Sequence, residues 1–127
     1  MSRAVRSTAL VALLVPSVAL AGGAAASSPS VHAARKCSLS AKEQRHMGAS
    51  YVTSLNVRKT SCRNGKAVVR AYHKCRRAHG WKGKCRHKVK GFSCKRRINT
   101  STSFQYDAKV TCRRGAKRVV HTYTQNK

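Results

Sequence analysis

Acidic residues are almost absent from this chain of 127 residues, which has only Glu43 and Asp107 against 28 lysines and arginines. The two acids fall in different predicted elements, so a hydrolase that works with a pair of carboxylates is poorly supported. The formal charge of +26 opposes compaction by self-repulsion and attracts polyanions without a dedicated site. We therefore expect an anionic partner, and charge that serves only solubility is the alternative.

Sequence motifs of the common enzyme classes are missing as well. The chain contains no glycine-rich phosphate loop and no Gly-x-Ser-x-Gly elbow. These absences favour a binding protein over an enzyme, and no cofactor is expected.

The chain has one long apolar run, residues 9–21, which lies near the N-terminus behind Arg3 and Arg6. Its length of about 13 residues is short of the roughly 20 that span a bilayer as a helix. The run ends in the small-x-small pattern Ala19-Leu20-Ala21, which is typical of signal-peptide cleavage. We predict a signal peptide over 1–26, cut between 21 and 34, a flexible linker over 27–36 and one domain over 37–127. The mature protein is then secreted and has no transmembrane segment.

All cysteines follow this leader, and an even number in a small exported chain predicts three disulfides. Cys75 and Cys85 flank a short loop, so a local bridge between them is the first expectation. For the others we expect Cys62–Cys94 and Cys37–Cys112, although the sequence alone does not choose among the pairings. The cysteine residues are Cys37, Cys62, Cys75, Cys85, Cys94 and Cys112.

Helical patterns appear twice. From about residue 62 to residue 78, Val68, Ala71, Tyr72 and Cys75 recur at helical spacing, with Ser61 as N-cap. Before it, residues 40–43 fit a capping box that begins a short helix, which ends at residue 48.

Alternating patterns predict strands over 51–58, 88–95, 104–112 and 119–123, the last two joined by a turn over 113–116. Phe104, Tyr106 and their alternate neighbours share one face of the third strand, and Val119, His121 and Tyr123 share one face of the fourth. The fold class is α+β: a small disulfide-stapled domain with one main helix on a 3–4-stranded antiparallel sheet and a short N-terminal helix.

Basic residues recur along the polar side of the long predicted helix and continue into the loop after it. Residues 63–97 contain no acid, and Trp81 is the aromatic ring expected to be exposed, since Tyr72 and Phe92 suit the core. Basic groups bind phosphates and an exposed ring stacks on bases. The candidate polyanion-binding residues are Arg63, Lys66, Arg70, Lys74, Arg77, Trp81, Lys82, Lys84, Arg86, Lys88 and Lys90.

Histidines support two weaker alternatives. His46 and His121 suggest general acid–base cleavage of RNA, and the segments around them faintly resemble the histidine segments of pancreatic-type ribonucleases. A zinc site is the second alternative, but export favours oxidised cysteines, so we expect no metal. The residues considered for zinc are His73, Cys75, His79, Cys85 and His87.

Four short segments together resemble small exported disulfide-containing proteins of high-GC actinobacteria, a group of uncharacterised function. They are residues 51–55, 60–62, 91–94 and 111–115, which hold a Ser-Cys helix start, a Gly-Phe-x-Cys strand and a Cys-x-x-Gly hairpin. The resemblance implies a fold and a compartment but no activity.

The interpretation favoured by the sequence is a secreted, cationic protein that binds polyanions without catalysis. Its ligand is a cell-wall polymer, a nucleic acid or an acidic protein. The alternative is a small secreted ribonuclease-like hydrolase that uses His46 and His121. A membrane-active function is a less favoured interpretation, because the domain needs the narrow apolar stripe of the helix for its own core.

Overall fold

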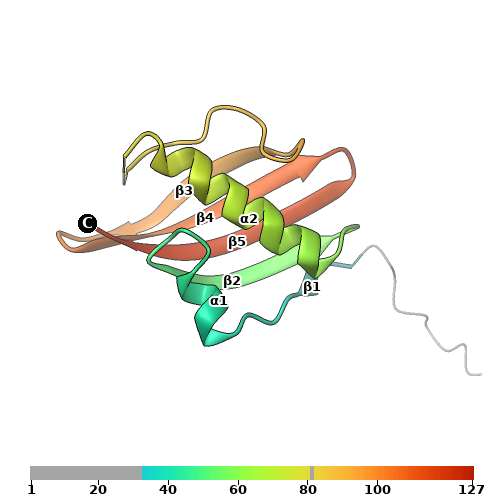
Figure 1. The fold of residues 1–127 in the computed structure, drawn as a ribbon, viewed down its shortest axis with the longest axis horizontal. Coiled ribbons are helices and arrows are strands. Elements are labelled where there is room, and N and C mark those ends of the chain that lie inside the picture. The colour runs from blue at the N-terminus through green and yellow to red at the C-terminus, as the bar shows by residue number, and fades with distance from the viewer. Residues whose placement is uncertain (1–32, 81) are drawn as a thin grey trace, which may run out of the picture.

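The computed structural model describes residues 33–80 and 82–127, in which a five-stranded antiparallel sheet carries the long helix on one face (Figure 1). The strands lie in the order β1-β2-β5-β4-β3. The α+β class is confirmed, and the sheet has more strands than the 3–4 expected. The elements are β1 (Arg35–Lys36), α1 (Ala41–Arg45), β2 (Tyr51–Arg58), α2 (Cys62–Arg77), β3 (Ser93–Ser101), β4 (Gln105–Arg114) and β5 (Lys117–Asn126).

The predicted signal peptide and most of the predicted linker lie outside the described residues. Within the described part of the chain, no helix is long and apolar enough to cross a membrane.

The long helix α2 begins where the sequence predicts, because the Ser61 hydroxyl accepts a hydrogen bond from the Asn64 amide. Its buried side is built from Val68, Val69 and Tyr72, each at most 1 % exposed. These side chains pack on the strand residues of one sheet face and close the core.

The short helix α1 has the predicted capping box. The Ser40 hydroxyl accepts from the Glu43 amide, and the Glu43 carboxylate accepts from the Ser40 amide. Both bonds satisfy donors that a helix start leaves open.

The strand predicted over 88–95 was placed too early. Val89 and Phe92 form an isolated bridge around Lys90 and Gly91, which both have positive φ, so this segment is a tight turn. The strand β3 begins at Ser93 and forms a hairpin with β4. Its charged, mostly exposed side chains suit the edge of a sheet, where a charged strand resists pairing with other chains.

Phe104 was also assigned wrongly to the core face of the late strand. It precedes β4, in the connection after β3, and is 81 % exposed. The rest of that alternation is confirmed, since Tyr106 and Val110 are buried, as are Val119 and Tyr123 of β5.

All three disulfides form, but only the local one pairs as expected. Cys75 is bonded to Cys85, whereas the other bridges are Cys37–Cys62 and Cys94–Cys112. The predicted pairs Cys62–Cys94 and Cys37–Cys112 are wrong because β3 and β4 form a hairpin in which Cys94 and Cys112 are direct register partners. Cys37 follows β1, which places it beside the start of α2.

Candidate polyanion-binding groove

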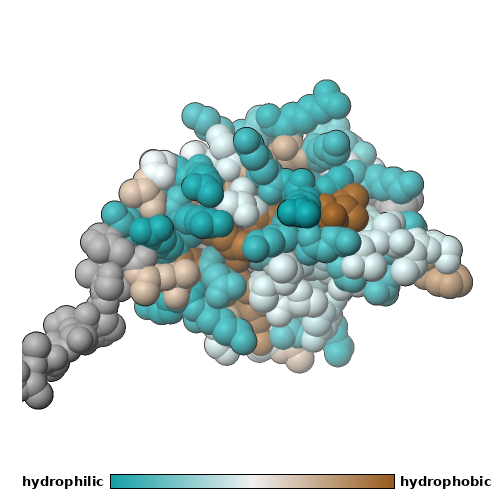
Figure 2. Space-filling model, turned by 180° about the vertical axis from the view of Figure 1, so that it is seen from behind, coloured by the Kyte–Doolittle hydropathy of each residue, from teal (hydrophilic) through white to brown (hydrophobic). Residues whose placement is uncertain are grey.

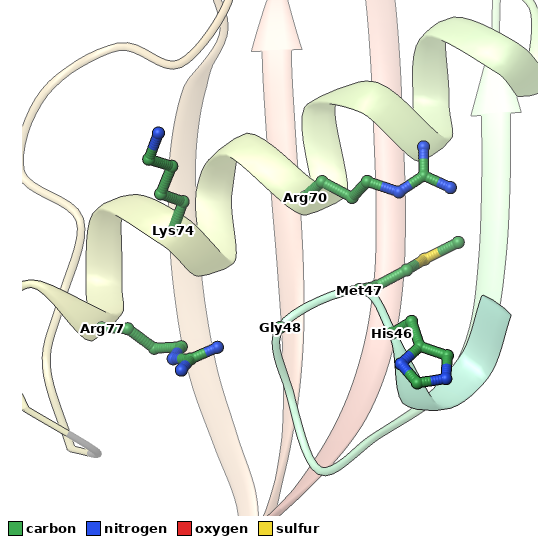
Figure 3. Close-up of a pocket in the computed structure, with 6 residues that line it drawn as sticks. All are labelled: His46, Met47, Gly48, Arg70, Lys74 and Arg77. Carbon is green, nitrogen blue, oxygen red and sulfur yellow. The ribbon is translucent and has the colours of Figure 1, made fainter. Parts of the chain in front are cut away.

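A hollow of about 420 Å³ lies between α2 and the loop that joins α1 to β2. Arg70, Lys74 and Arg77 of α2 line one side of it, and residues 46–48 line the other (Figure 3). A second hollow of about 320 Å³ shares Gly48 and Arg77 with the first and extends it toward Gln125. We call the two together the α2 groove.

The three basic residues of the α2 groove follow one another at i, i+4 and i+7, which brings them to one side of the helix. All three are exposed, and none of the described groove-lining residues is an acid. In Figure 3 the side chains of Arg70 and Arg77 extend along the side of α2 toward the loop, and Lys74 points away from it. Two guanidinium forks and an ammonium group in one groove suit phosphate or carboxylate oxygens.

Gly48 allows the wall of the groove to come this close. Its φ is +92°, and a Cβ atom on it would lie 2.8 Å from the Cβ of His73. A side chain at residue 48 would therefore push the loop away from α2.

Two of the predicted helix cations lie outside the groove. Arg63 is exposed in the first turn of α2. The ammonium group of Lys66 lies 2.6 Å from the carboxylate of Glu43. This hydrogen bond, together with that from the Ser40 amide, lowers the pKa of Glu43 to about 2. Lys66 is thus engaged in an ion pair within the protein.

The loop after α2 runs along the other flank of the helix, so the structure divides the predicted site into two parts (Figure 1). Arg96 holds this loop to β3 by donating to the carbonyl oxygens of Lys82 and Gly83. Trp81 lies outside the described residues. The basic loop residues, all exposed and none lining the α2 groove, are Lys82, Lys84, Arg86, Lys88 and Lys90.

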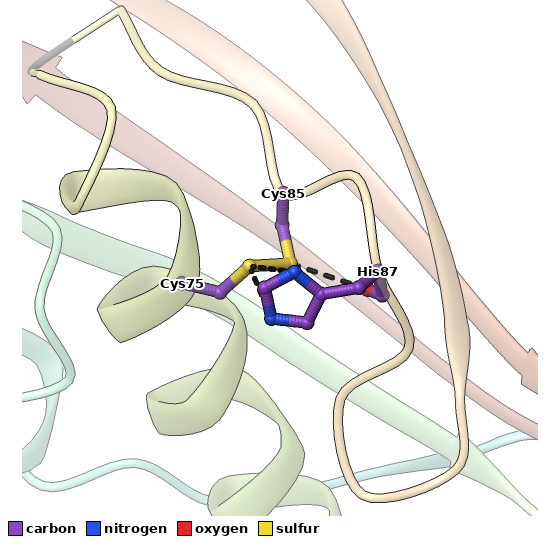
Figure 4. Close-up of side chains that lie close together, drawn as sticks. All are labelled: Cys75, Cys85 and His87. Atoms are coloured by element: carbon purple, nitrogen blue, oxygen red, sulfur yellow. Dashed lines mark hydrogen bonds between the residues drawn. A yellow bond between two sulfur atoms is a disulfide. The ribbon is translucent and has the colours of Figure 1, made fainter.

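The cluster considered for zinc is arranged around a disulfide (Figure 4). Nε2 of the His87 ring lies 3.3 Å from the sulfur of Cys75. With the sulfur of Cys85, these residues offer three potential ligand atoms that lie within 4.8 Å of one another. Both sulfur atoms are used in the bridge, so neither is a thiolate ligand while the bridge is intact. His73 is buried and His79 is exposed, and neither belongs to this set.

The histidines of α2 and β5, His73 and His121, form a buried chain of hydrogen bonds with Arg76. Arg76 Nε donates to His73 Nδ1 at 2.7 Å, and His73 Nε2 lies 3.1 Å from His121 Nε2. Because His73 Nδ1 accepts, a neutral His73 has its hydrogen on Nε2 and donates it to His121. The hydrogen of a neutral His121 is then on Nδ1, a buried atom that bonds to no described residue.

Aromatic rings enclose this chain of hydrogen bonds. His73 makes an edge contact with Tyr123, with ring centroids 4.6 Å apart, and the Arg76 guanidinium lies over the same ring at 4.8 Å. Arg76 also donates to Gln125 at 2.5 Å. Burial, reinforced by the nearby Arg76 charge, lowers the pKa of His121 to about 3, and burial beside His121 and Arg76 lowers the pKa of His73 further.

These positions bear directly on the ribonuclease alternative. His46 is exposed at the groove, but His121 has 0 % exposure on the core face of β5. An imidazole that no solvent reaches touches no substrate, and general acid–base transfer requires hydrogen-bond reach. The structure therefore places the two histidines in different environments, one on the surface and one in the core.

Sequence reasoning missed the burial of His73 and Arg76, which fall on the same side of α2 as Val69 and Tyr72. The helical spacing marks that side, but polar residues are not expected on it.

No protein-family model, no curated protein and no solved structure matches the chain.

Proposed function

We propose that this protein is a secreted, non-catalytic binder of polyanions and that the α2 groove is its binding site. The single observation that carries the proposal is the gathering of Arg70, Lys74 and Arg77 along one hollow with no acid among its described lining residues. The formal charge of +26 adds long-range attraction, which raises the local concentration of an anionic polymer.

The ligand class follows from the groove's chemistry. The groove presents exposed cations in a row along one side of α2, so a polymer with repeated negative charges fits it best. Nothing in the groove reads base edges, and binding should therefore show little sequence preference among nucleic acids. Cell-wall polymers and acidic proteins offer the same repeated charge.

Secretion is part of the proposal and is supported by two features. The N-terminal sequence has the charge and apolar pattern of an export signal. The cysteines form three disulfides, which persist in oxidising compartments.

The test is the salt dependence of binding to a short single-stranded oligonucleotide. Replacing Arg70, Lys74 and Arg77 together by Gln removes three phosphate contacts, each worth a slope of about −0.7 in log affinity against log salt. The slope should become flatter by about two units. The matched control replaces Lys84, Arg86 and Lys88 by Gln, which removes the same charge outside the groove.

The control variant should change the slope by less than one unit if the groove is the site. Far-UV circular dichroism verifies that both variants stay folded, which is expected because all six side chains are exposed. A groove variant that keeps the parent slope contradicts the site. Equal flattening by both variants would mean that only total charge matters.

A further inference from the structure

The face of the sheet turned away from α2 has an unusual arrangement of charge. On the register of the sheet, Arg58 of β2 lies directly opposite Arg118 of β5, and Arg118 lies directly opposite Arg113 of β4. Three arginines thus cross three neighbouring strands in one row. With strands about 4.8 Å apart, the row spans about 10 Å.

Two further rows continue the charge. Lys95 of β3 is opposite Thr111, and Arg97 of β3 is opposite Lys109, which is in turn opposite Thr122 of β5. Figure 2 shows this side of the molecule, where hydrophilic side chains surround a smaller apolar area. We call these rows the sheet surface. Its basic residues are Arg58, Lys95, Arg97, Lys109, Arg113 and Arg118.

This arrangement works against the stability of the sheet. Like charges directly opposite each other on neighbouring strands destabilise the pairing. The acid on this face, Asp107, lies beyond these rows and accepts a hydrogen bond from Thr124 at 2.5 Å. The folding of the domain gains nothing from the row of arginines, so its presence suggests a ligand.

The sheet surface is also hollowed. One hollow of about 580 Å³ is lined by Lys95, Arg97, Lys109, Arg113 and Arg118, among others. A second hollow, of about 290 Å³, shares Lys109 and Arg118 with it and reaches Arg58, so the two adjoin.

Arg118 lies where the two hollows meet. It is half-buried, and its Nε atom is buried without a hydrogen bond to any described residue. A buried donor without a partner is costly unless a ligand or a water satisfies it. The center of the sheet surface thus combines positive charge with a buried donor that has no hydrogen-bond partner among the described residues.

The chemistry of these rows indicates the kind of ligand. Guanidinium groups bind phosphate oxygens through paired hydrogen bonds, and the rows hold four of them. They hold no aromatic ring among the described residues. The aromatic side chain on this face, Tyr51, lies in the row of Thr124 and Asp107, where the carboxylate repels a phosphate chain. A ligand held here gains from its phosphates and not from the stacking of bases.

We propose that the sheet surface is a second binding site, specific for a flexible phosphate-bearing polymer whose bases, if it has any, are not used. The site lies on the face of the sheet opposite to α2 and does not depend on the α2 groove. If both sites are occupied, one molecule bridges two polymer chains. Only this bridging rests on the proposed function of the α2 groove.

The experiment measures binding of a short inorganic polyphosphate chain, too short to reach both faces, by isothermal titration calorimetry. The sheet variant carries Arg58→Gln, Arg113→Gln and Arg118→Gln. The α2-groove variant described above removes the same charge from the other face. We expect two polyphosphate chains per parent molecule and one per molecule of either variant.

Thermal melting provides the control for folding. Removing like charges that face each other should raise the melting temperature of the sheet variant. If the triple variant does not fold, the single variant Arg118→Gln tests the same site. It should bind polyphosphate at this site less tightly, and the slope of log affinity against log salt should be flatter by about 0.7.

The outcomes separate the two sites. A sheet variant that still binds two chains overturns the sheet surface as a site and leaves the α2 groove untouched. A groove variant that still binds two chains contradicts the proposed function and leaves the sheet surface standing. A single-stranded oligonucleotide or a DNA duplex of equal phosphate number that binds the groove variant tenfold more tightly than polyphosphate overturns the choice of ligand.

Discussion

The buried histidines predict a strong loss of stability in mild acid. The pKa values of both His73 and His121 are lowered in the folded protein, the latter to about 3, because both rings are fully buried beside Arg76. In the unfolded chain both return to an ordinary pKa of about 6.5. Between these values the unfolded state binds protons that the folded state excludes. Stability is therefore fully present above about pH 6.5 and is lost as the pH falls.

The magnitude follows from the linkage relation. A histidine that is neutral when folded and has an ordinary pKa when unfolded costs about 2 kcal/mol at pH 5 relative to pH 8, so the two together cost about 4 kcal/mol. This is a large part of the roughly 5–15 kcal/mol that stabilises a typical domain. Glu43, whose pKa is lowered to about 2, adds to the loss only below about pH 4.5.

Urea unfolding at pH 8, 7, 6 and 5 measures this loss. The variant His121→Gln should show about half the parent's decrease in the free energy of unfolding, because one of the two histidines is gone. His46→Gln is the matched control, since His46 is exposed and should leave the decrease unchanged.

A second measurement does not depend on a folded variant. The ring signals of His73 and His121 in the parent protein, followed by NMR, should not titrate between pH 8 and 5. A decrease below about 1 kcal/mol between pH 8 and 5, or a ring signal of His121 that titrates near pH 6, would refute the reasoning.

Further predictions concern α2 and the segments attached to it. Gly48→Ala should cost about 1–3 kcal/mol in chemical unfolding, since it places a side chain at positive φ with its Cβ 2.8 Å from another Cβ atom; no loss would contradict the tight loop. Glu43→Gln should lower the melting temperature only slightly but strengthen polyanion binding slightly through long-range attraction, because it removes one acid and frees Lys66; unchanged binding would show that Lys66, which lies outside the groove, takes no part. Replacing Cys75 and Cys85 by Ser should cost about 2–4 kcal/mol, and thiol alkylation of the parent before reduction should label no cysteine.

The long helix and the last hairpin were predictable because local signals agree there. Ser61 provides an N-cap, and the apolar residues of β4 and β5 alternate clearly. The strand β3 was misplaced because Lys95, Arg96 and Arg97 interrupt any apolar alternation, and an edge strand needs none.

The disulfide errors follow from that misplacement. With β3 set too early, the sequence offered no register between β3 and β4, and so Cys94 had no reason to face Cys112. If the predicted strand had started at residue 93 and paired with β4 as a hairpin, Cys94 and Cys112 would have been expected to face each other.

The candidate sites were predictable in part. The polar side of α2 was visible from the spacing of Arg70, Lys74 and Arg77, but their neighbours across the groove come from a loop that no periodicity places. The row of arginines on the sheet surface depends on register between β2, β4 and β5, which a single sequence does not reveal.

The most direct test of the account is to map the contacts of a short single-stranded oligonucleotide by NMR on the isotope-labelled protein. At physiological salt we expect large amide shifts at residues 46–50 and along α2 at Arg70, Lys74 and Arg77. A second, separate set should appear on the sheet surface, around Arg113 and Arg118. The loop over 82–90 should change less, although it is equally basic. Shifts spread evenly over all exposed basic residues would show general charge attraction and contradict a binding site in the α2 groove.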